Sequence, residues 1–337
     1  MYNVAVAGHI CLDLTPALPL GIGMLPGNLY DIGGMTSRPG GCIVNVGVAL
    51  AGLTLRPKLW GAIGEDDFGD IVLREVERLG LRTEGIIRSA EHHTSYSIVI
   101  EPAGMNRTFW HHTGANSSFD GRFIETDGTD LLHLGYPSLV PGLLAEGGAP
   151  LESVMRRARR DGVTTSLDLA VVDPDSAIGR LDWHGILDRV LQEVDVISPS
   201  VDDLTSALES GPVTSEQDLI ALADELIAKG VAVVMVSAGE DGLLLRTAGA
   251  ERLAQGGRVL QGLGAEWADA SVFVQAKECD EIATTNGAGD AATAGLLYGL
   301  AAGLSPTATG DIATTVARRW IQQRELTAED LAAASAV

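Results

Sequence analysis

The chain has 337 residues, 46% of them hydrophobic, which is enough to bury the core of one large α/β domain or of two small ones. Its formal net charge of −22 argues against nucleic acid and anionic membranes as partners, because both are themselves negatively charged. The three cysteines match no metal-ligand spacing, so the sequence predicts neither disulfides nor a zinc site. The start of the chain lacks the features of a signal peptide, and no apolar run reaches membrane-spanning length, so we expect a cytoplasmic protein.

The first predicted element is a short buried strand at residues 3–8. Asp13 follows it, near the place where open α/β sheets bind ligands, although the same position also suits a turn cap before Pro16. Residues 16–31 are rich in proline and glycine, and we expect them to leave the sheet.

A pair of glycines, Gly40 and Gly41, comes next and precedes a predicted helix that carries Asn45 in its first turn. Paired glycines let a backbone approach a ligand closely, but they also suit a tight loop before a close-packed helix. A strand and the glycine-rich segment 61–69 (GAIGEDDFG) follow.

Two β-rich runs, residues 94–101 and 107–111, are separated by a turn-like segment and predict a hairpin. Arg107 on the second run either contacts a substrate hydroxyl or phosphate or is an exposed strand arginine. His111 and His112 are adjacent and therefore point to opposite strand faces, which is poor metal-ligand geometry. We interpret them as surface residues or substrate contacts.

Strands and helices then alternate to the end of the chain, which predicts a mostly parallel sheet covered on both sides. The expected strands are 130–135, 163–168, 194–198, 231–237 and 242–246. The expected helices are 151–161, 183–192, 215–229, 291–300, 305–323 and 327–334.

Two strand ends in this half carry polar or glycine-rich turns. Ser200 and Asp203 follow the strand 194–198. Ser237, Gly239 and Gly242 follow the strand 231–237, although a simple β-turn accounts for Gly242 by itself.

Gly287, Ala288 and Gly289 open the predicted helix 291–300, and Asp290 follows them at once. Such a turn leaves backbone N–H groups unpaired at the positive end of the helix dipole, where phosphate binds well. Asp290 can cap the helix, or it can accept a proton from a hydroxyl held above it. Taken alone, these four residues also fit an ordinary glycine-rich helix start.

The longer string Thr285–Asp290 (TNGAGD) resembles the C-terminal signature of the ribokinase-like (PfkB-type) carbohydrate kinases. The succession from the glycine pair to segment 61–69 resembles the N-terminal signature of the same family, so two motifs occur in the expected order. The resemblance implies an α/β fold of three layers with a mostly parallel central sheet. It also implies a single kinase domain over residues 1–337, with a small β lid from segments of about 14–34 and 94–115.

The activity implied by the resemblance is transfer of the ATP γ-phosphoryl group to a sugar hydroxymethyl group. Asp290 would be the base, and the backbone of Gly287, Ala288 and Gly289 would bind the transferred phosphoryl group. The implied sugar-binding residues are Asp13, Gly40, Gly41, Asn45 and Arg107. The implied nucleotide-side residues are Ser200, Ser237, Gly239, Gly242, Thr285 and Asn286. Asp203 would help to hold Mg²⁺, and the resemblance leaves open a monovalent cation and a homodimer formed through the lid.

The chain departs from the family pattern at two places. Ser200 and Asp203 stand where the family usually has Asn-x-x-Glu, and Thr284 stands where it usually has aspartate. Three hypotheses therefore remain: a carbohydrate kinase, a nucleoside kinase with Phe109 or Trp110 lining the sugar-side pocket, or a degenerate sugar- or nucleotide-binding relative. The absence of Gly-Lys-Ser/Thr excludes a P-loop kinase, and Gly8 opens no G-x-G-x-x-G, which disfavours a dinucleotide-binding enzyme.

Overall fold

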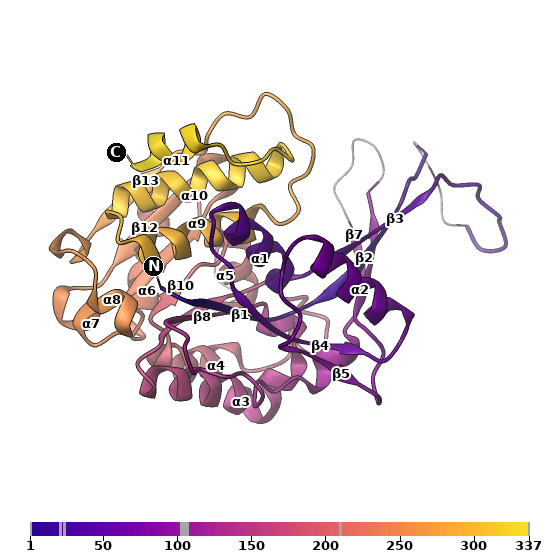
Figure 1. The fold of residues 1–337 in the computed structure, drawn as a ribbon, viewed down its shortest axis with the longest axis horizontal. Helices are drawn as coiled ribbons and strands as arrows, with labels where there is room; N and C mark the ends of the chain where they lie inside the picture. The colour runs from indigo at the N-terminus through magenta and orange to yellow at the C-terminus, as the bar shows by residue number, and fades with distance from the viewer. Residues whose placement is uncertain (1, 20–21, 23–24, 102–107, 209–210, 336–337) are drawn as a thin grey trace.

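The computed structural model describes residues 2–19, 22, 25–101, 108–208 and 211–335. Within them, nine strands form one sheet in the spatial order β13-β12-β11-β10-β9-β8-β1-β4-β5 (Figure 1). The strands from β11 through β5 are parallel, whereas β12 and β13 are antiparallel to their neighbours. The bounds are Val4–Gly8 (β1), Lys58–Gly64 (β4), Ile86–Ser89 (β5), Leu131–Gly135 (β8), Thr164–Asp168 (β9), Val196–Ile197 (β10), Val233–Ser237 (β11), Leu243–Thr247 (β12) and Ser271–Val274 (β13).

Helices cover both faces of this sheet, as the alternation of elements predicted. Because side chains alternate along a strand, Val4 and Val6 of β1 join one core cluster while Ala5 and Ala7 join the other. The first cluster includes α1, α9 and α10, and the second includes α3, α4 and α6, on opposite sides of the sheet in Figure 1. The helices are Cys42–Gly52 (α1), Asp67–Arg78 (α2), Pro141–Arg160 (α3), Trp183–Val190 (α4), Val201–Leu208 (α5), Glu216–Ala228 (α6), Ala250–Ala254 (α7), Arg258–Gln261 (α8), Ala288–Ala302 (α9), Pro306–Ile321 (α10) and Ala328–Ser335 (α11).

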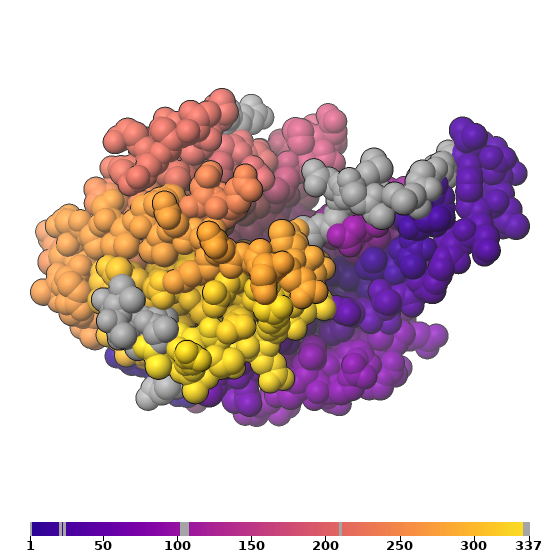
Figure 2. Space-filling view, turned by 90° about the horizontal axis from the view of Figure 1, so that it is seen from above, coloured from indigo at the N-terminus to yellow at the C-terminus, as the bar shows by residue number. Residues whose placement is uncertain are grey.

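A smaller sheet of four described strands stands beside the main body in the order β3-β2-β6-β7. Its strands are Cys11–Pro16 (β2), Met35–Gly40 (β3), Tyr96–Ile100 (β6) and Thr108–His112 (β7). Figure 2 shows that this part of the chain, in indigo and purple, projects away from the body. The predicted mostly parallel central sheet with a separate small β sheet is therefore confirmed.

The small sheet corrects two local expectations. Asp13 lies inside strand β2 and not in a turn after the first strand. Gly40 is the last residue of β3 and not part of a loop. The strand tolerates Pro39 because β3 is at the edge of its sheet, where a missing N–H donor costs no ladder bond.

Two further differences concern element lengths. The predicted helix 151–161 is the second half of α3, which is interrupted at residues 145–148 because Glu146, Gly147 and Gly148 adopt positive φ. The predicted strand 194–198 is reduced to Val196–Ile197. No helix among the described residues is long and apolar enough to cross a membrane.

Candidate active site

The site lies where the order of strands in the large sheet changes direction. From β1 the chain continues to β4 on one side, whereas β8 and its successors lie on the other side. The carboxyl ends of β1 and β8 are in close contact, because a Cβ on Gly8 would lie 2.2 Å from the carbonyl oxygen of Gly135. His9 and Tyr136 follow these two strands and therefore emerge side by side at a place where open α/β sheets bind ligands.

The glycine pair packs tightly against this edge. A Cβ on Gly40 would lie 2.3 Å from Oδ2 of Asp13, and one on Gly41 would lie 2.5 Å from the carbonyl oxygen of His9. Gly41 also has φ of 90° and is the N-cap residue of α1. Backbone contacts and positive φ therefore require Gly41, whereas the neighbour of Gly40 is a side chain that can move. The roles of both glycines in sugar binding stay predictions.

The helix that follows the glycine pair brings two predicted residues together across the fold. Asn45, in the first turn of α1, donates a hydrogen bond from Nδ2 to Oδ2 of Asp290 at 2.9 Å. The contact orients the carboxylate at the start of α9, which packs against α1.

The glycine turn opens α9, although the helix begins at Ala288, three residues earlier than predicted. Gly287 is the N-cap residue with φ of 79°, and a Cβ there would lie 2.9 Å from Nε1 of Trp320. The same indole N–H donates to the carbonyl oxygen of Asn286 at 2.7 Å. Gly289 differs, since a Cβ there would meet nothing within 4 Å. The turn is therefore held from one side by Trp320 and open at Gly289.

Two amides of this turn are already engaged. The N–H of Ala288 points back to the carbonyl oxygen of Thr285 at 3.4 Å. The N–H of Asn286 donates to Oγ1 of Thr284 at 3.1 Å. Thr284 thus supplies a hydrogen-bond acceptor within this loop.

Asp290 is 1% exposed, and burial raises the pKa of its carboxyl group to about 6. Hydrogen bonds from Asn45 and Tyr136 oppose that shift, and the charge of Asp203 adds to it. Oδ1 has no well-formed hydrogen bond from any described residue. A carboxylate with a free oxygen and a pKa near neutrality is suited to accept a proton.

Two further carboxylates lie near Asp290. Asp168 ends β9, and burial together with the charges of Asp203 and Asp290 raises its pKa well above the ordinary value. Burial also raises the pKa of Asp203 to about 6. No cation contributes to the interactions of these three groups among the described residues.

This arrangement fits a magnesium ion carried by nucleotide phosphates. Carboxylate oxygens are the ligands that Mg²⁺ prefers, and the ion usually keeps waters and phosphates as its other ligands. Within the described ranges, no group of three His, Cys, Asp or Glu residues could hold a metal ion alone. The role of these carboxylates in holding Mg²⁺ therefore stays a prediction.

Ser200 and Asp203 form a capping box at the start of α5. The backbone N–H and the hydroxyl of Ser200 both donate to Oδ2 of Asp203, at 2.8 and 2.6 Å, and the N–H of Asp203 approaches Oγ of Ser200 at 3.2 Å. Helix capping accounts for both residues, so their nucleotide and metal roles stay predictions.

The predicted nucleotide-side turn lies next to this cap. Ser200 and Ser237 form an isolated β-bridge, which brings the two hydroxyl residues together. A Cβ on Gly242 would lie 2.1 Å from the carbonyl oxygen of Val274, so strand packing alone requires that glycine. Gly239, with φ of 60°, faces open space. Arg107 lies outside the described residues.

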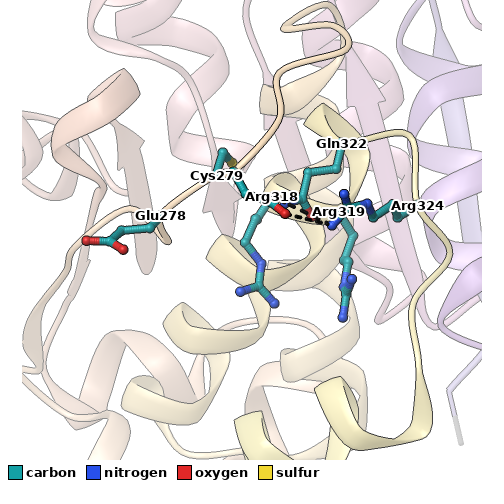
Figure 3. Close-up of a pocket in the computed structure, with 7 residues that line it drawn as sticks. Glu278, Cys279, Arg318, Arg319, Gln322 and Arg324 are labelled. Atoms are coloured by element: carbon teal, nitrogen blue, oxygen red, sulfur yellow. Dashed lines mark hydrogen bonds and ion pairs between the residues drawn. The ribbon is translucent and has the colours of Figure 1, made fainter.

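A separate pocket of about 350 Å³ lies between the segment before the glycine turn and the C-terminal half of α10 (Figure 3). Its arginines are already paired: Arg318 and Arg319 with Asp330, and Arg324 with Asp280 and Glu281. The pocket therefore presents no free cationic group among its described lining residues.

The motifs did not identify His9, Tyr136 and Asp168 as site residues. Each one ends or directly follows a parallel strand, which is the same positional signal that identified Asp13. Applied to every parallel strand, that signal would have found them.

The chain is similar to known carbohydrate kinases. The family model of the pfkB family carbohydrate kinases matches residues 1–332. The 2-dehydro-3-deoxygluconokinase of Bacillus subtilis (strain 168) is 23% identical over 287 residues, covering 83% of this chain and 79% of the relative. Fructokinase-2 of Oryza sativa subsp. japonica is 26% identical over 248 residues, covering 71% of this chain and 69% of the relative.

Among solved structures, the ribokinase of Arabidopsis thaliana complexed with ribose and ATP has a TM-score of 0.74 at 17% identity, covering 95% of this chain and 93% of its own. At 17% identity, that likeness shows the fold alone. The family is shown by the family model, which matches residues 1–332. The chain therefore belongs to the pfkB family of carbohydrate kinases and is a phosphotransferase that acts on sugar hydroxyl groups.

Proposed function

We propose that this protein transfers the γ-phosphoryl group of ATP to a hydroxymethyl group of a sugar, with residues 1–337 acting as one kinase domain and the small sheet as its lid. The observation that carries the proposal is the state of Asp290. Its carboxyl group is buried, is oriented by Asn45, and has a pKa of about 6 because burial raises it. The residue lies in the first turn of α9, the helix that the glycine turn opens.

In this mechanism Asp290 accepts the proton of the sugar hydroxyl as that oxygen attacks phosphorus. A general base of this kind contributes about 10²–10⁴ in rate. The backbone of Gly287, Ala288 and Gly289 at the start of α9 stabilises charge that develops on the phosphoryl oxygens. Asp13, Gly40, Gly41, Asn45 and Arg107 remain the proposed sugar-binding residues.

The nucleotide would lie along Ser200, Ser237, Gly239, Gly242, Thr285 and Asn286. Asp203, with Asp168 beside it, would hold Mg²⁺, which neutralises phosphate charge when it is bound. The ATP complex of the Arabidopsis ribokinase supports the choice of nucleotide. A monovalent cation stays a prediction, which rate measurements with and without K⁺ would test.

The first test replaces the proposed base. In Asp290→Asn, we expect the turnover number to fall by at least about 10²–10⁴, because the amide cannot accept the proton. ATP affinity, measured by calorimetry, should stay within a few-fold. The control is Asp188→Asn, which removes a surface carboxylate paired with Lys229. Normal turnover by Asp290→Asn would show that the base is another group.

The substrate is identified by ATP consumption over a panel of acceptors with and without Mg²⁺. The panel contains ribose, fructose, 2-dehydro-3-deoxygluconate, phosphorylated sugars and nucleosides. A nucleoside kinase is the second candidate, because Phe109 shares a strand face with His111 and is 45% exposed. Binding of an acceptor without any turnover would favour a degenerate relative.

We also propose a homodimer formed through the lid and a location in the cytoplasm, where ATP is available. The support for the dimer is the apolar surface of the small sheet and its connecting arm. Leu25, Leu29, Ile32, Met35, Phe109 and Trp110 are all exposed there.

A further inference from the structure

The segment before the glycine turn has no regular secondary structure, yet the end of α10 holds it in place. Residues 275–287 connect β13 to α9 and form neither helix nor strand. The N–H groups of Ala283 and Thr284 both donate to the carbonyl oxygen of Ile321, the last residue of α10, at 3.0 and 3.1 Å. The conformation of the segment that leads into the turn therefore depends on α10.

Trp320 is the residue of α10 that contacts the glycine turn itself. Its indole N–H donates to the carbonyl oxygen of Asn286 at 2.7 Å. A Cβ on Gly287 would lie 2.9, 3.0 and 3.1 Å from Nε1, Cζ2 and Cε2 of the same indole. The ring therefore lies directly against the backbone at which Asn286 joins Gly287.

The hydrogen bond from Trp320 also sets the direction of the next N–H group along the chain. A trans peptide is planar, and its C=O and N–H groups point in opposite directions. Because the Asn286 carbonyl group points at the indole, the N–H of Gly287 points away from it. That N–H makes no hydrogen bond to any residue that the structure describes. It is therefore an oriented and unused donor at the positive end of α9.

The helix that carries Trp320 is fixed on two sides. Against α9 it packs closely, since a Cβ on Gly295 would lie 2.5 Å from Cα of Ala313. Against α11, Arg319 donates two hydrogen bonds of 2.9 Å to the carboxylate of Asp330. The indole is consequently held by a helix that is itself anchored, and it can determine the position of the turn.

We propose that Trp320 is a positioning residue for phosphoryl transfer, because its indole fixes the Asn286–Gly287 peptide so that the N–H of Gly287 donates to an oxygen of the transferred phosphoryl group. In that step the acceptor oxygen bonds to phosphorus, the bond to the ADP leaving group breaks, and Asp290 takes the hydroxyl proton. A donor that is already oriented stabilises the charge on the phosphoryl oxygens without reorganising during the reaction. This inference rests on the proposed function and adds a residue outside the glycine-turn motif.

Trp267 provides a matched control at the other end of α9. Its ring is fully buried, and its indole N–H donates to the carbonyl oxygen of Leu304 at 2.9 Å. Leu304 follows the C-cap residue of α9, whereas Asn286 precedes the N-cap residue. Both indoles therefore hold a backbone carbonyl group beside the same helix, but only Trp320 does so at the end that carries Asp290.

The first experiment compares Trp320→Phe with Trp267→Phe, because each variant keeps an aromatic ring and loses the N–H donor. With the best acceptor from the substrate panel, Trp320→Phe should lower kcat at least about 10-fold, since loss of one donor to developing charge costs about 10²–10³. The KM for the acceptor and the calorimetric Kd for ATP should stay within about 3-fold, because the contact acts mainly in the transition state. Trp267→Phe should keep kcat within about 3-fold, although both variants should lower the Tm by a few degrees.

The second experiment follows the indole N–H signals of the wild-type protein by ¹H–¹⁵N NMR and needs no turnover. When the Gly287 N–H donates to a phosphate oxygen, the carbonyl group of the same peptide becomes a stronger acceptor, because linked hydrogen bonds polarise one another. Addition of Mg²⁺ and AMP-PNP, an ATP analogue that resists phosphoryl transfer, should therefore move the Trp320 indole proton downfield. The Trp267 indole proton should stay in place.

The outcomes separate this inference from the proposed function. A kcat within about 3-fold of wild type in Trp320→Phe, together with an inactive Asp290→Asn, would leave the function standing and overturn the role of Trp320. Equal losses of kcat in both phenylalanine variants would show that Trp320 acts only through stability. Turnover of no acceptor by the wild-type enzyme would contradict the proposed function. In that event, or if Trp320→Phe does not fold, the NMR signal decides: an unmoved Trp320 indole proton would overturn the inference.

Discussion

At Asp290, burial and hydrogen bonding act on the same carboxyl group in opposite directions. Burial raises the pKa, whereas Asn45 and Tyr136 lower it, and the result is a value of about 6. The group is therefore ionised at neutral pH but still basic enough to take a proton. Tyr136 has φ of 61° and ψ of 50°, a left-handed conformation that costs a non-glycine residue about 1–3 kcal/mol. Such strain is typical of functional positions.

Tyr136→Phe tests the tyrosine hydroxyl at Asp290. Removing a hydrogen bond that stabilises the carboxylate should raise the pKa of Asp290 by about 0.5–1 unit. Since the ionised form is the active one, the acid side of the kcat–pH profile should move to higher pH by the same amount. The rate above pH 8 should change little.

Tyr30→Phe is the control, because Tyr30 lies on the exposed arm between β2 and β3. If the acid side of the profile for Tyr136→Phe coincides with that of wild type, the tyrosine hydroxyl does not affect the base.

At the scale of elements, α9 combines two left-handed glycines with different surroundings. Gly287 at its start packs against Trp320. Gly303 at its end has φ of 68°, and a Cβ there would meet nothing within 4 Å. A non-glycine residue would therefore be strained at both positions, but its Cβ would be crowded only at Gly287.

The pair Gly287→Ala and Gly303→Ala separates these effects. Each should lose roughly 1–2 kcal/mol of unfolding free energy, because alanine is strained at positive φ. Only Gly287→Ala must also displace the Trp320 ring, so only this variant should lower kcat, by about 10-fold or more. Urea unfolding and steady-state kinetics provide both measurements. Full kcat in Gly287→Ala would mean that the turn geometry does not limit the reaction.

At the scale of the whole molecule, exposed apolar surface and net charge have opposite effects on self-association. The arm between β2 and β3 exposes 99% of Leu29 and 65% of Leu25, which favours association. The net charge of −22 makes two copies repel each other.

We therefore expect a dimer whose dissociation constant decreases as salt is raised from 0.02 to 0.3 M, because salt screens the repulsion. Leu29→Asp should shift the sedimentation equilibrium toward monomer by at least about 10-fold in dissociation constant. Leu79→Asp, at an exposed position after α2, should leave it unchanged. A wild-type protein that sediments as a monomer at every salt concentration would contradict the lid dimer.

Much of this molecule followed from local sequence patterns. Strand and helix periods predicted the mostly parallel sheet and its covering helices, because those periods depend on neighbouring residues alone. The glycine turn and Asp290 were likewise visible, since a helix start is specified within a few residues. Asp13 was expected just beyond the first strand, at a ligand-binding position or as a turn cap. Its place inside a strand was not predicted, because that strand pairs only with segments distant in sequence, Met35–Gly40 and Tyr96–Ile100.

Only the tertiary structure decided which side chains meet and with what chemistry. The contact of Asn45 with Asp290 joins the first and ninth helices, and the pair of His9 and His111 joins the body to the lid. The pKa of Asp290 depends on burial and on charges such as Asp203, which approach it only in the folded chain. The sequence by itself determined the elements and the candidate base, whereas long-range packing determined the base's neighbours, its burial and hence its proton affinity.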